Sequence, residues 1–260
     1  MRGPLDSEAL HEALVTSGTP WQGVDVHAEL GSTNAAAAAL GQPWRVVVAD
    51  HQSAGRGRLG RSWEAPPGTS IAVSVLVPAP SHGIGWVPLL TGLAVERAVA
   101  EVTGLHAGLK WPNDVLVEED GWRKVCGVLC EVHPLGVVVG FGVNVHQQRD
   151  ELPVENATSL ALCGAQDVRR EDLITACLRH LADLHGDLMA GGDALEAARA
   201  AYRSACRTLG MVVDINTGGA SQRVPAVGVD DEGRLVVHGE GGEYAVAAGD
   251  VVHVREAGPR

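Results

Sequence analysis

The sequence predicts an α+β protein, in which a mixed sheet carries helices on one side and is followed by a small C-terminal β-barrel. Two observations point to this fold class. Up to residue 209, β-branched runs alternate with longer segments whose apolar residues have helical spacing. After Gly210, short strands of alternating pattern are separated by glycine-containing turns, which is typical of a small barrel. We therefore predict two domains, residues 1–209 and residues 210–260.

Within both domains, glycine or proline marks most of the expected element ends. Residues 109–145 are predicted to form three strands, joined by turns at residues 120–121 and 134–136. The other expected elements of the first domain are helices at 6–16, 35–41, 85–104, 169–190 and 194–209, and strands at 24–30, 45–50 and 69–78. In the barrel we expect strands at residues 211–216, 222–229, 234–240, 243–247 and 250–256.

One expected helix start brings polar groups together. Ser32, Thr33 and Asn34 precede the alanine-rich helix at residues 35–41, and Gly41 is its expected stop. Side chains of these types accept hydrogen bonds from the free amides of a first helical turn. The sequence therefore predicts a polar helix mouth at this point.

Composition restricts the class of protein. The 260-residue chain has a formal net charge of −12 spread along its length, so we expect no nucleic-acid partner. No apolar run is long enough to span a membrane, and the N-terminus has no secretory pattern, so a cytoplasmic protein is predicted. An odd number of cysteines without a Cys-x-x-Cys pair predicts buried free thiols, at Cys126, Cys130, Cys163, Cys177 and Cys206.

The most informative segment is residues 55–61, Gly-Arg-Gly-Arg-Leu-Gly-Arg. Its three glycines free the backbone to bend and expose its amides, and its three arginines add fixed positive charge in an acidic chain. Arginine forks make bidentate hydrogen bonds to phosphate and carboxylate oxygens. The segment therefore predicts a loop that wraps an anion.

Three other interpretations of this loop are weaker. The spacing of Gly55, Gly57 and Gly60 matches the dinucleotide fingerprint, but a strand rather than a helix follows, and the acidic residue expected about twenty positions on is missing. A P-loop requires Gly-Lys-Ser or Gly-Lys-Thr, which this segment lacks. Glycine-arginine repeats also occur in disordered nucleic-acid-binding segments, but this one is brief and framed by strands.

Three further patterns are ambiguous when each is taken alone. Residues 110–115, Lys-Trp-Pro-Asn-Asp-Val, could be a simple turn. Lys124 opens an apolar strand, where it is either a surface lysine or a charge aimed into a site. The glycines of residues 139–144 are bulge positions or leave room for a ligand or another backbone. Beside the loop, His51 is expected to be structural.

Taken together and in order, these segments resemble the biotin protein ligase family. The matching features are Ser32-Thr33-Asn34, Gln52-Ser53-Ala54 with the GRGRLGRSW that follows, KWPNDV, Lys124-x-x-Gly127, and GFGVN ending at Asn144. The resemblance extends over residues 24–256. It implies a class II synthetase-like catalytic domain and an SH3-like C-terminal barrel.

The resemblance also implies what each site residue does. Lys124 and Arg58 would be catalytic, Trp63 and Trp111 apolar walls, and Asp114 a weak contact to Mg²⁺ carried by phosphates. The biotin side would comprise Ser32, Thr33, Asn34, Gln52, Gly55, Arg56, Gly57, Arg58, Trp63, Lys124 and Gly127. The ATP or adenylate side would comprise Arg58, Arg61, Trp63, Lys110, Asn113, Lys124 and Asn144.

The implied reaction joins biotin and ATP into biotinyl-5′-AMP and then transfers biotin to a lysine of a biotin carboxyl carrier domain. Two anions must meet, so arginine, lysine and Mg²⁺ are expected rather than a covalent nucleophile. About twenty residues precede the first matched strand, too few for a winged helix-turn-helix, so we expect a ligase without a repressor domain. The alternatives are a lipoate or octanoyl ligase, a non-catalytic biotin or nucleotide sensor, and a DNA-binding regulator.

Overall fold

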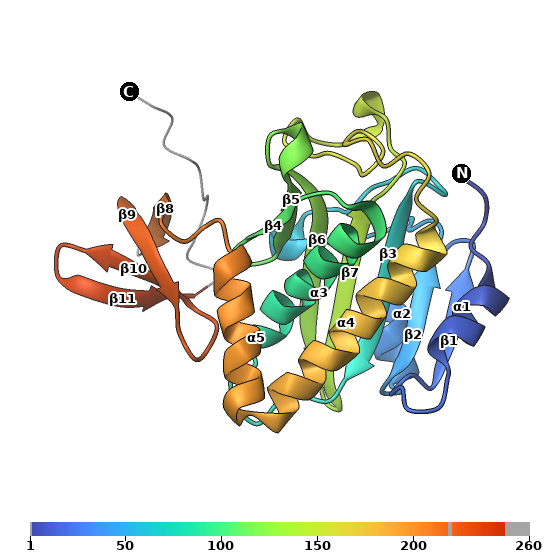
Figure 1. Cartoon of the computed structure of the whole chain (residues 1–260), viewed down its shortest axis with the longest axis horizontal. Helices are drawn as coiled ribbons and strands as arrows, with labels where there is room; N and C mark the ends of the chain where they lie inside the picture. Colours follow the sequence, from blue (N-terminus) through green and yellow to red (C-terminus); the bar gives the residue numbers. More distant parts are fainter. Residues whose placement is uncertain (1, 218–219, 248–260) are drawn as a thin grey trace.

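The computed structural model describes residues 2–217 and 220–247 and contains two sheets, with the smaller one at one end of the molecule (Figure 1). The larger sheet has the order β1-β2-β3-β7-β6-β5-β4. β1 and β2 are parallel and every other pair is antiparallel, so the sheet is mixed, as predicted. Its strands are β1 (Gly23–His27), β2 (Arg45–Ala49), β3 (Ser70–Val77), β4 (Ala107–Lys110), β5 (Asp114–Val117), β6 (Arg123–His133) and β7 (Gly136–Asn144).

The long helices cover one face of this sheet, as the sequence predicted (Figure 1). Val46 and Val48 of β2 point into the core on this face, whereas Val47 belongs to a smaller apolar cluster on the opposite face. The short helix α2 (Thr33–Leu40) packs on that opposite face through Ala37. The helices of the first face are α1 (Ser7–Leu14), α3 (Trp86–Thr103), α4 (Arg170–Ala190) and α5 (Gly192–Ala205).

The expectation of three strands within residues 109–145 was wrong, because four strands lie in this part of the chain. A turn at Trp111-Pro112-Asn113 separates β4 from β5, and Lys110 at the end of β4 then pairs with Asp114 at the start of β5. This hairpin was missed because the strands on both sides of the turn have only four residues each, too few to show a clear alternating pattern. The turn carries the second motif of the predicted site.

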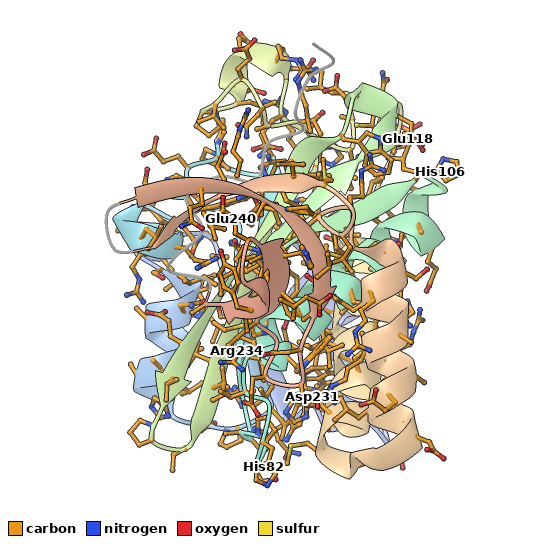
Figure 2. The ribbon with its side chains drawn as sticks, turned by 90° about the vertical axis from the view of Figure 1, so that its left-hand side faces the viewer. His82, His106, Glu118, Asp231, Arg234 and Glu240 are labelled. Carbon is orange, nitrogen blue, oxygen red and sulfur yellow. The ribbon has the colours of Figure 1, made fainter. Side chains whose placement is uncertain are left out.

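The small sheet has the order β11-β10-β9-β8 and is antiparallel throughout. Figure 2 shows it on the side nearest the viewer, with Asp231 and Arg234 labelled at the turn between β9 and β10. Its strands are β8 (Val212–Thr217), β9 (Ala220–Val229), β10 (Leu235–Gly239) and β11 (Gly242–Val246). The fifth predicted strand, residues 250–256, lies outside the described residues, and the domain division at residues 209 and 210 stays a prediction.

The local signals around α2 are confirmed in detail. Ser32 is the N-cap, and its hydroxyl accepts a hydrogen bond from the amide of Ala35 at 3.4 Å. Gly41 ends the helix in the left-handed conformation at φ 61°, which glycine adopts without steric cost.

The five cysteines are free, and four are buried while Cys130 is half-buried. Among the described helices, none combines the length and apolar character needed to cross a bilayer.

Candidate functional site

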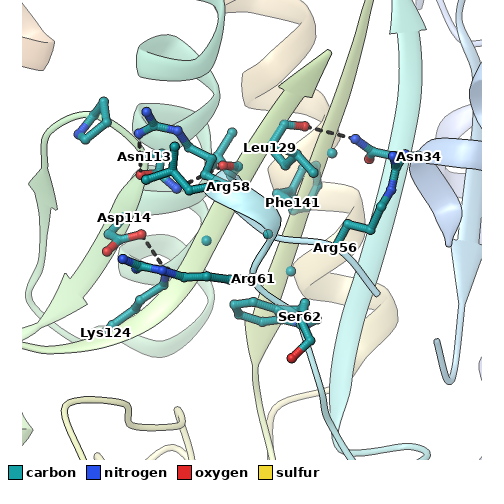
Figure 3. Close-up of a pocket in the computed structure, with 18 of the residues that line it drawn as sticks. Asn34, Arg56, Arg58, Arg61, Ser62, Asn113, Asp114, Lys124, Leu129 and Phe141 are labelled. Carbon is teal, nitrogen blue, oxygen red and sulfur yellow. Dashed lines mark hydrogen bonds and ion pairs between the residues drawn. The ribbon is translucent and has the colours of Figure 1, made fainter. Parts of the chain in front are cut away.

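Two adjoining cavities are both lined by the glycine-arginine loop, with volumes of about 250 and 500 Å³. The smaller one is bounded by the start of α2, the turn after β4, and the neighbouring strands β6 and β7 (Figure 3). Here side chains from the three separated motifs face one another. We call it the central cavity.

One end of the central cavity is a neutral hydrogen-bonded network. The amide oxygen of Gln52 accepts from the backbone N–H of Thr33 at 2.8 Å and from its hydroxyl at 3.0 Å. The hydroxyl of Ser74 lies 2.8 Å from the Thr33 hydroxyl and 2.6 Å from Asn34 Oδ1. Sequence reasoning missed Ser74, although a serine that stands within a wholly buried strand was a signal for a polar partner.

Glu131 on β6 is a second residue that the sequence predictions missed. Its carboxylate accepts from Asn34 Nδ2 at 2.7 Å and pairs with Arg56 at 2.9 Å. The pair ties the first arginine of the loop to the sheet, in a half-exposed position where an ion pair by itself contributes little stability. A glutamate among apolar strand residues was the available signal.

Glycines of β6 and β7 make room for the Trp63 indole. A Cβ on Gly142 would lie 2.6 Å from Trp63 Cε2, and one on Gly127 would lie 3.1 Å from Cζ3. Gly142, one of the glycines of residues 139–144, is therefore not a bulge position: it pairs in register on both sides and makes room for the Trp63 side chain. The buried Trp63 Nε1 has no hydrogen-bond partner among the described residues, so it is available to a ligand.

The other end of the cavity is charged. Lys124 Nζ lies 2.6 Å from Asp114 Oδ1, and Arg58 donates to Asn113 Oδ1 at 3.1 Å (Figure 3). Burial lowers the pKa of the Arg58 guanidinium, and the Asp114 carboxylate partly offsets this by raising it. With Arg61 also lining the cavity, cations gather around a volume that could hold an anion.

The backbone of Lys124 is clamped on its outer side. Its N–H donates to the carbonyl of Asn156 at 2.9 Å, and its own carbonyl accepts from Thr158 at 2.8 Å. Arg149 holds the same segment by donating to the Ala157 carbonyl at 3.0 Å. The backbone direction at Lys124, the second residue of β6, is therefore fixed. Asn156 is a further cavity residue that the sequence did not indicate.

The structure brings most of the predicted site residues to the central cavity. Trp111 is among the lining residues but is only 2% exposed. The predicted residues that line the cavity are Ser32, Asn34, Gln52, Arg56, Gly57, Arg58, Arg61, Trp63, Lys110, Asn113, Asp114, Lys124 and Gly127.

Thr33, Gly55 and Asn144 are predicted site residues that lie outside the lining set. Thr33 stands directly behind Gln52, and Gly55 is packed against the backbone of Trp63. Asn144 is buried, and its amide donates to the Thr158 carbonyl at 2.9 Å and accepts from Gln147 at 2.9 Å. In this structure Asn144 therefore supports the loop that clamps Lys124.

Gly140 offers a direct test of the neutral end. A Cβ at this position would overlap Asn34 Oδ1, so Gly140→Ala should displace Asn34 and its bond to Ser74. We expect a loss of about 1–3 kcal/mol in the free energy of unfolding, typical of overpacking, and weaker ligand binding. Chemical denaturation and calorimetric titration measure both. Gly186→Ala on α4, where a Cβ meets nothing within 4 Å, is the matched control. Equal behaviour of the two variants would contradict this role.

Comparison with known proteins agrees with this geometry. Residues 38–147 match the model described as the biotin/lipoate A/B protein ligase family, and residues 208–254 match that of the biotin protein ligase C-terminal domain. The chain is 38% identical to a biotin--[acetyl-CoA-carboxylase] ligase of Mycobacterium tuberculosis, covering 98% of each chain. It is 29% identical to a bifunctional ligase/repressor of Bacillus subtilis, over 86% of this chain and 68% of that protein.

Among solved structures, the biotin protein ligase of Aquifex aeolicus in complex with biotin and ATP has a TM-score of 0.77 at 28% identity. The match covers 88% of this chain and 97% of that one. Both the catalytic part and the C-terminal sheet are therefore represented in relatives, and the similarity to the mycobacterial enzyme spans nearly the whole sequence. The chain belongs to the biotin protein ligase family.

Proposed function

We propose that this protein activates biotin with ATP to give biotinyl-5′-AMP and pyrophosphate, and then transfers biotin to a lysine of a biotin carboxyl carrier domain. The observation that carries the proposal is the distribution of polar groups in the central cavity. One end has neutral hydrogen-bonding groups and the other has cations. Biotin has the same division, a neutral ureido ring and a carboxylate. Family membership agrees with this activity.

Each end of the cavity suits one part of the substrate. Ser32 and Gln52 would hydrogen-bond the ureido ring, because amide and hydroxyl groups match its donors and acceptor, and Thr33 would hold Gln52 in place from behind. Trp63 would cover the apolar chain of biotin and one face of the adenylate. Arg56 is held by Glu131, so its guanidinium would act on the loop rather than on the biotin carboxylate.

In the first step, a biotin carboxylate oxygen attacks the α-phosphorus of ATP, and pyrophosphate leaves. The reacting groups repel each other and negative charge develops on the phosphoryl oxygens, so fixed cations lower the barrier. Lys124 would exchange its partner Asp114 for the carboxylate and the α-phosphate, with Arg58 and Arg61 on the phosphate oxygens. Lys110 and Asn113 would complete the nucleotide side, and Asn144 would support it from behind the cavity wall by holding the loop that clamps Lys124.

In the second step, the acceptor amine attacks the acyl carbon of the adenylate, and AMP leaves. The adenylate also reacts with water, so the site must exclude solvent until the acceptor arrives. The glycine-arginine loop, which forms one wall of both cavities, would close over the adenylate and supply this protection.

The carboxylate of Asp114 is suited to contact an Mg²⁺ ion that is bound to the phosphates of ATP. Asp114 faces the central cavity, and Mg²⁺ is commonly held by one or two carboxylates together with substrate phosphates. No cluster of three or more acidic, histidine or cysteine side chains suited to a metal occurs among the described residues. Mg²⁺ would therefore be held mainly by ATP, where it neutralises phosphate charge. Because the reaction consumes ATP, we place it in the cytoplasm.

The transfer step has a simple test. Incubation with ATP, biotin and an isolated biotin carboxyl carrier domain should add one biotin to that domain, detected by intact mass spectrometry. The control is the same domain with its acceptor lysine changed to arginine, which should gain nothing. If both forms were labelled equally, or neither, the proposed acceptor would be wrong.

A further inference from the structure

The turn between β9 and β10, residues 230–234, is seated firmly on the catalytic domain. Trp86 Nε1 donates to the carbonyl of Asp230 at 3.1 Å and to that of Asp231 at 3.0 Å. Arg199 donates to the Asp231 carbonyl at 2.8 Å and lies over the Trp86 ring. A Cβ on Gly83, in the loop that leads into α3, would lie 3.1 Å from the Asp231 carbonyl oxygen.

Two glycines allow this close contact. A Cβ on Gly85 would overlap the carbonyl oxygen of Glu232, and a Cβ on Gly233 would lie 2.6 Å from the Gly85 carbonyl carbon. Gly233 also has φ 79°, which side chains rarely tolerate. The backbones at Gly85 and Gly233 are already in contact, so the position of the turn on the catalytic domain is fixed by steric contact.

The same turn contacts Trp111, a residue that lines the central cavity. Trp111 Nε1 donates to the carbonyl of Gly233 at 3.1 Å, and the backbone N–H of Trp111 donates to the hydroxyl of Thr208 at 3.0 Å. Trp111 is buried to 2% exposure, which makes both bonds costly to lose. Its ring is therefore fixed between the C-terminal sheet and the cavity.

The residues that follow Trp111 contact the charged groups of the site. Asn113 accepts from Arg58 at 3.1 Å and donates to the Val128 carbonyl at 3.0 Å. Asp114 pairs with Lys124 at 2.6 Å. A shift of the Trp111 turn would consequently displace Asn113 and Asp114, the partners of Arg58 and Lys124. The neutral end of the cavity would stay in place.

We propose that Trp111 is a positioning residue through which the β9–β10 turn of the C-terminal sheet sets the geometry of Asn113 and Asp114 for adenylate formation. This inference rests on the proposed function. It assigns a role to the C-terminal sheet that does not require the sheet to touch either substrate. The Gly233 carbonyl and the indole N–H form the connecting contact.

Trp111→Phe removes the indole donor and keeps an aromatic ring, so it tests the contact directly. We expect kcat of biotin-dependent pyrophosphate exchange to fall about tenfold, because small misplacements of reacting groups carry large rate costs. The dissociation constant for biotin without ATP should stay within about twofold, because the hydrogen-bonded end of the cavity around Gln52 does not depend on the Trp111 turn. Rates are expressed per biotin-binding site, so loss of folded protein does not enter.

Gly85→Ala tests the same link from the other side, because its Cβ forces the turn away. It should give the same split between kcat and biotin affinity, and the double variant should be less than additive. Trp21→Phe and Gly186→Ala are matched controls with unchanged kcat, since Trp21 is a buried core tryptophan and Gly186 has open space.

The outcomes separate the two claims. Without biotin-dependent exchange in the unaltered protein, the proposed function itself fails. With such exchange, unchanged kcat in Trp111→Phe and Gly85→Ala overturns the positioning role. Equal losses of kcat and biotin affinity, or full additivity in the double variant, also overturn it, because a general loss of structure would then explain the data.

Discussion

Replacing Lys124 with alanine should lower the rate of adenylate formation by about 10²–10³-fold, the effect of removing one main charge-stabilising donor from an active site. The ammonium lies 2.6 Å from Asp114 in the cavity wall, and no other lysine than Lys110 exists in the sequence to replace it. Single-turnover formation of biotinyl-AMP measures the effect. The fold should persist, because the side chain is a quarter exposed.

The Asp114 carboxylate would lose its partner in this variant, which gives an internal control. Asp114→Asn combined with Lys124→Ala removes the uncompensated charge and should restore stability without restoring adenylate formation. A Lys124→Ala protein that turns over biotin and ATP at the normal rate would show that the lysine does not act on the reacting atoms.

Changing Arg58 to glycine should release the adenylate and raise biotinylation of bystander proteins about tenfold or more, with lower affinity for biotinyl-AMP. Charge-assisted hydrogen bonds to a partly buried guanidinium hold phosphate groups strongly. Arg58 is at the centre of the loop, half-buried, and bonded to Asn113. Labelling of a lysine-rich bystander protein in solution, followed by blotting, measures the release.

The sequence adds an unusual feature to this experiment. Lys110 and Lys124, both in the cavity wall, are the two lysines of the chain, so released adenylate finds few acceptor amines on the enzyme itself. Mass spectrometry of Arg58→Gly should therefore show little self-labelling while the bystander is labelled. Arg179→Ala, which removes an exposed pair with Glu101 on the helical side, is the control. Equal bystander labelling in both variants would contradict the loop's role.

Much of this architecture could be predicted from local patterns. Ser32 and Gly41 determine the ends of α2 through capping and a left-handed turn, and these are interactions between close neighbours in sequence. The glycine-arginine loop could be identified from its residue types, whereas residues 110–115 were ambiguous by themselves and the hairpin that they form was missed. The features that could be predicted are determined by interactions between residues that are close in sequence.

Long-range partners could not be predicted in this way. Ser74 and Glu131 looked like ordinary strand residues, and only the pairing of β3 with β7 and of β7 with β6 brings them to Asn34. The bond from Trp111 to Gly233 joins residues 122 positions apart. Such contacts depend on strand order and domain seating, which no single segment encodes.

Biotin-dependent exchange of labelled pyrophosphate into ATP is the most direct test of the central claim, because it needs only adenylate formation and no acceptor. We expect exchange with biotin, and little or none with lipoate or octanoate, whose apolar or dithiolane ends cannot satisfy the hydrogen-bonding groups of Gln52 and Ser32. The Lys124→Ala protein should show exchange that is slower by about 10²–10³-fold. Exchange that is absent with biotin, or that is faster with lipoate or octanoate, would contradict the assignment of this cavity to biotin.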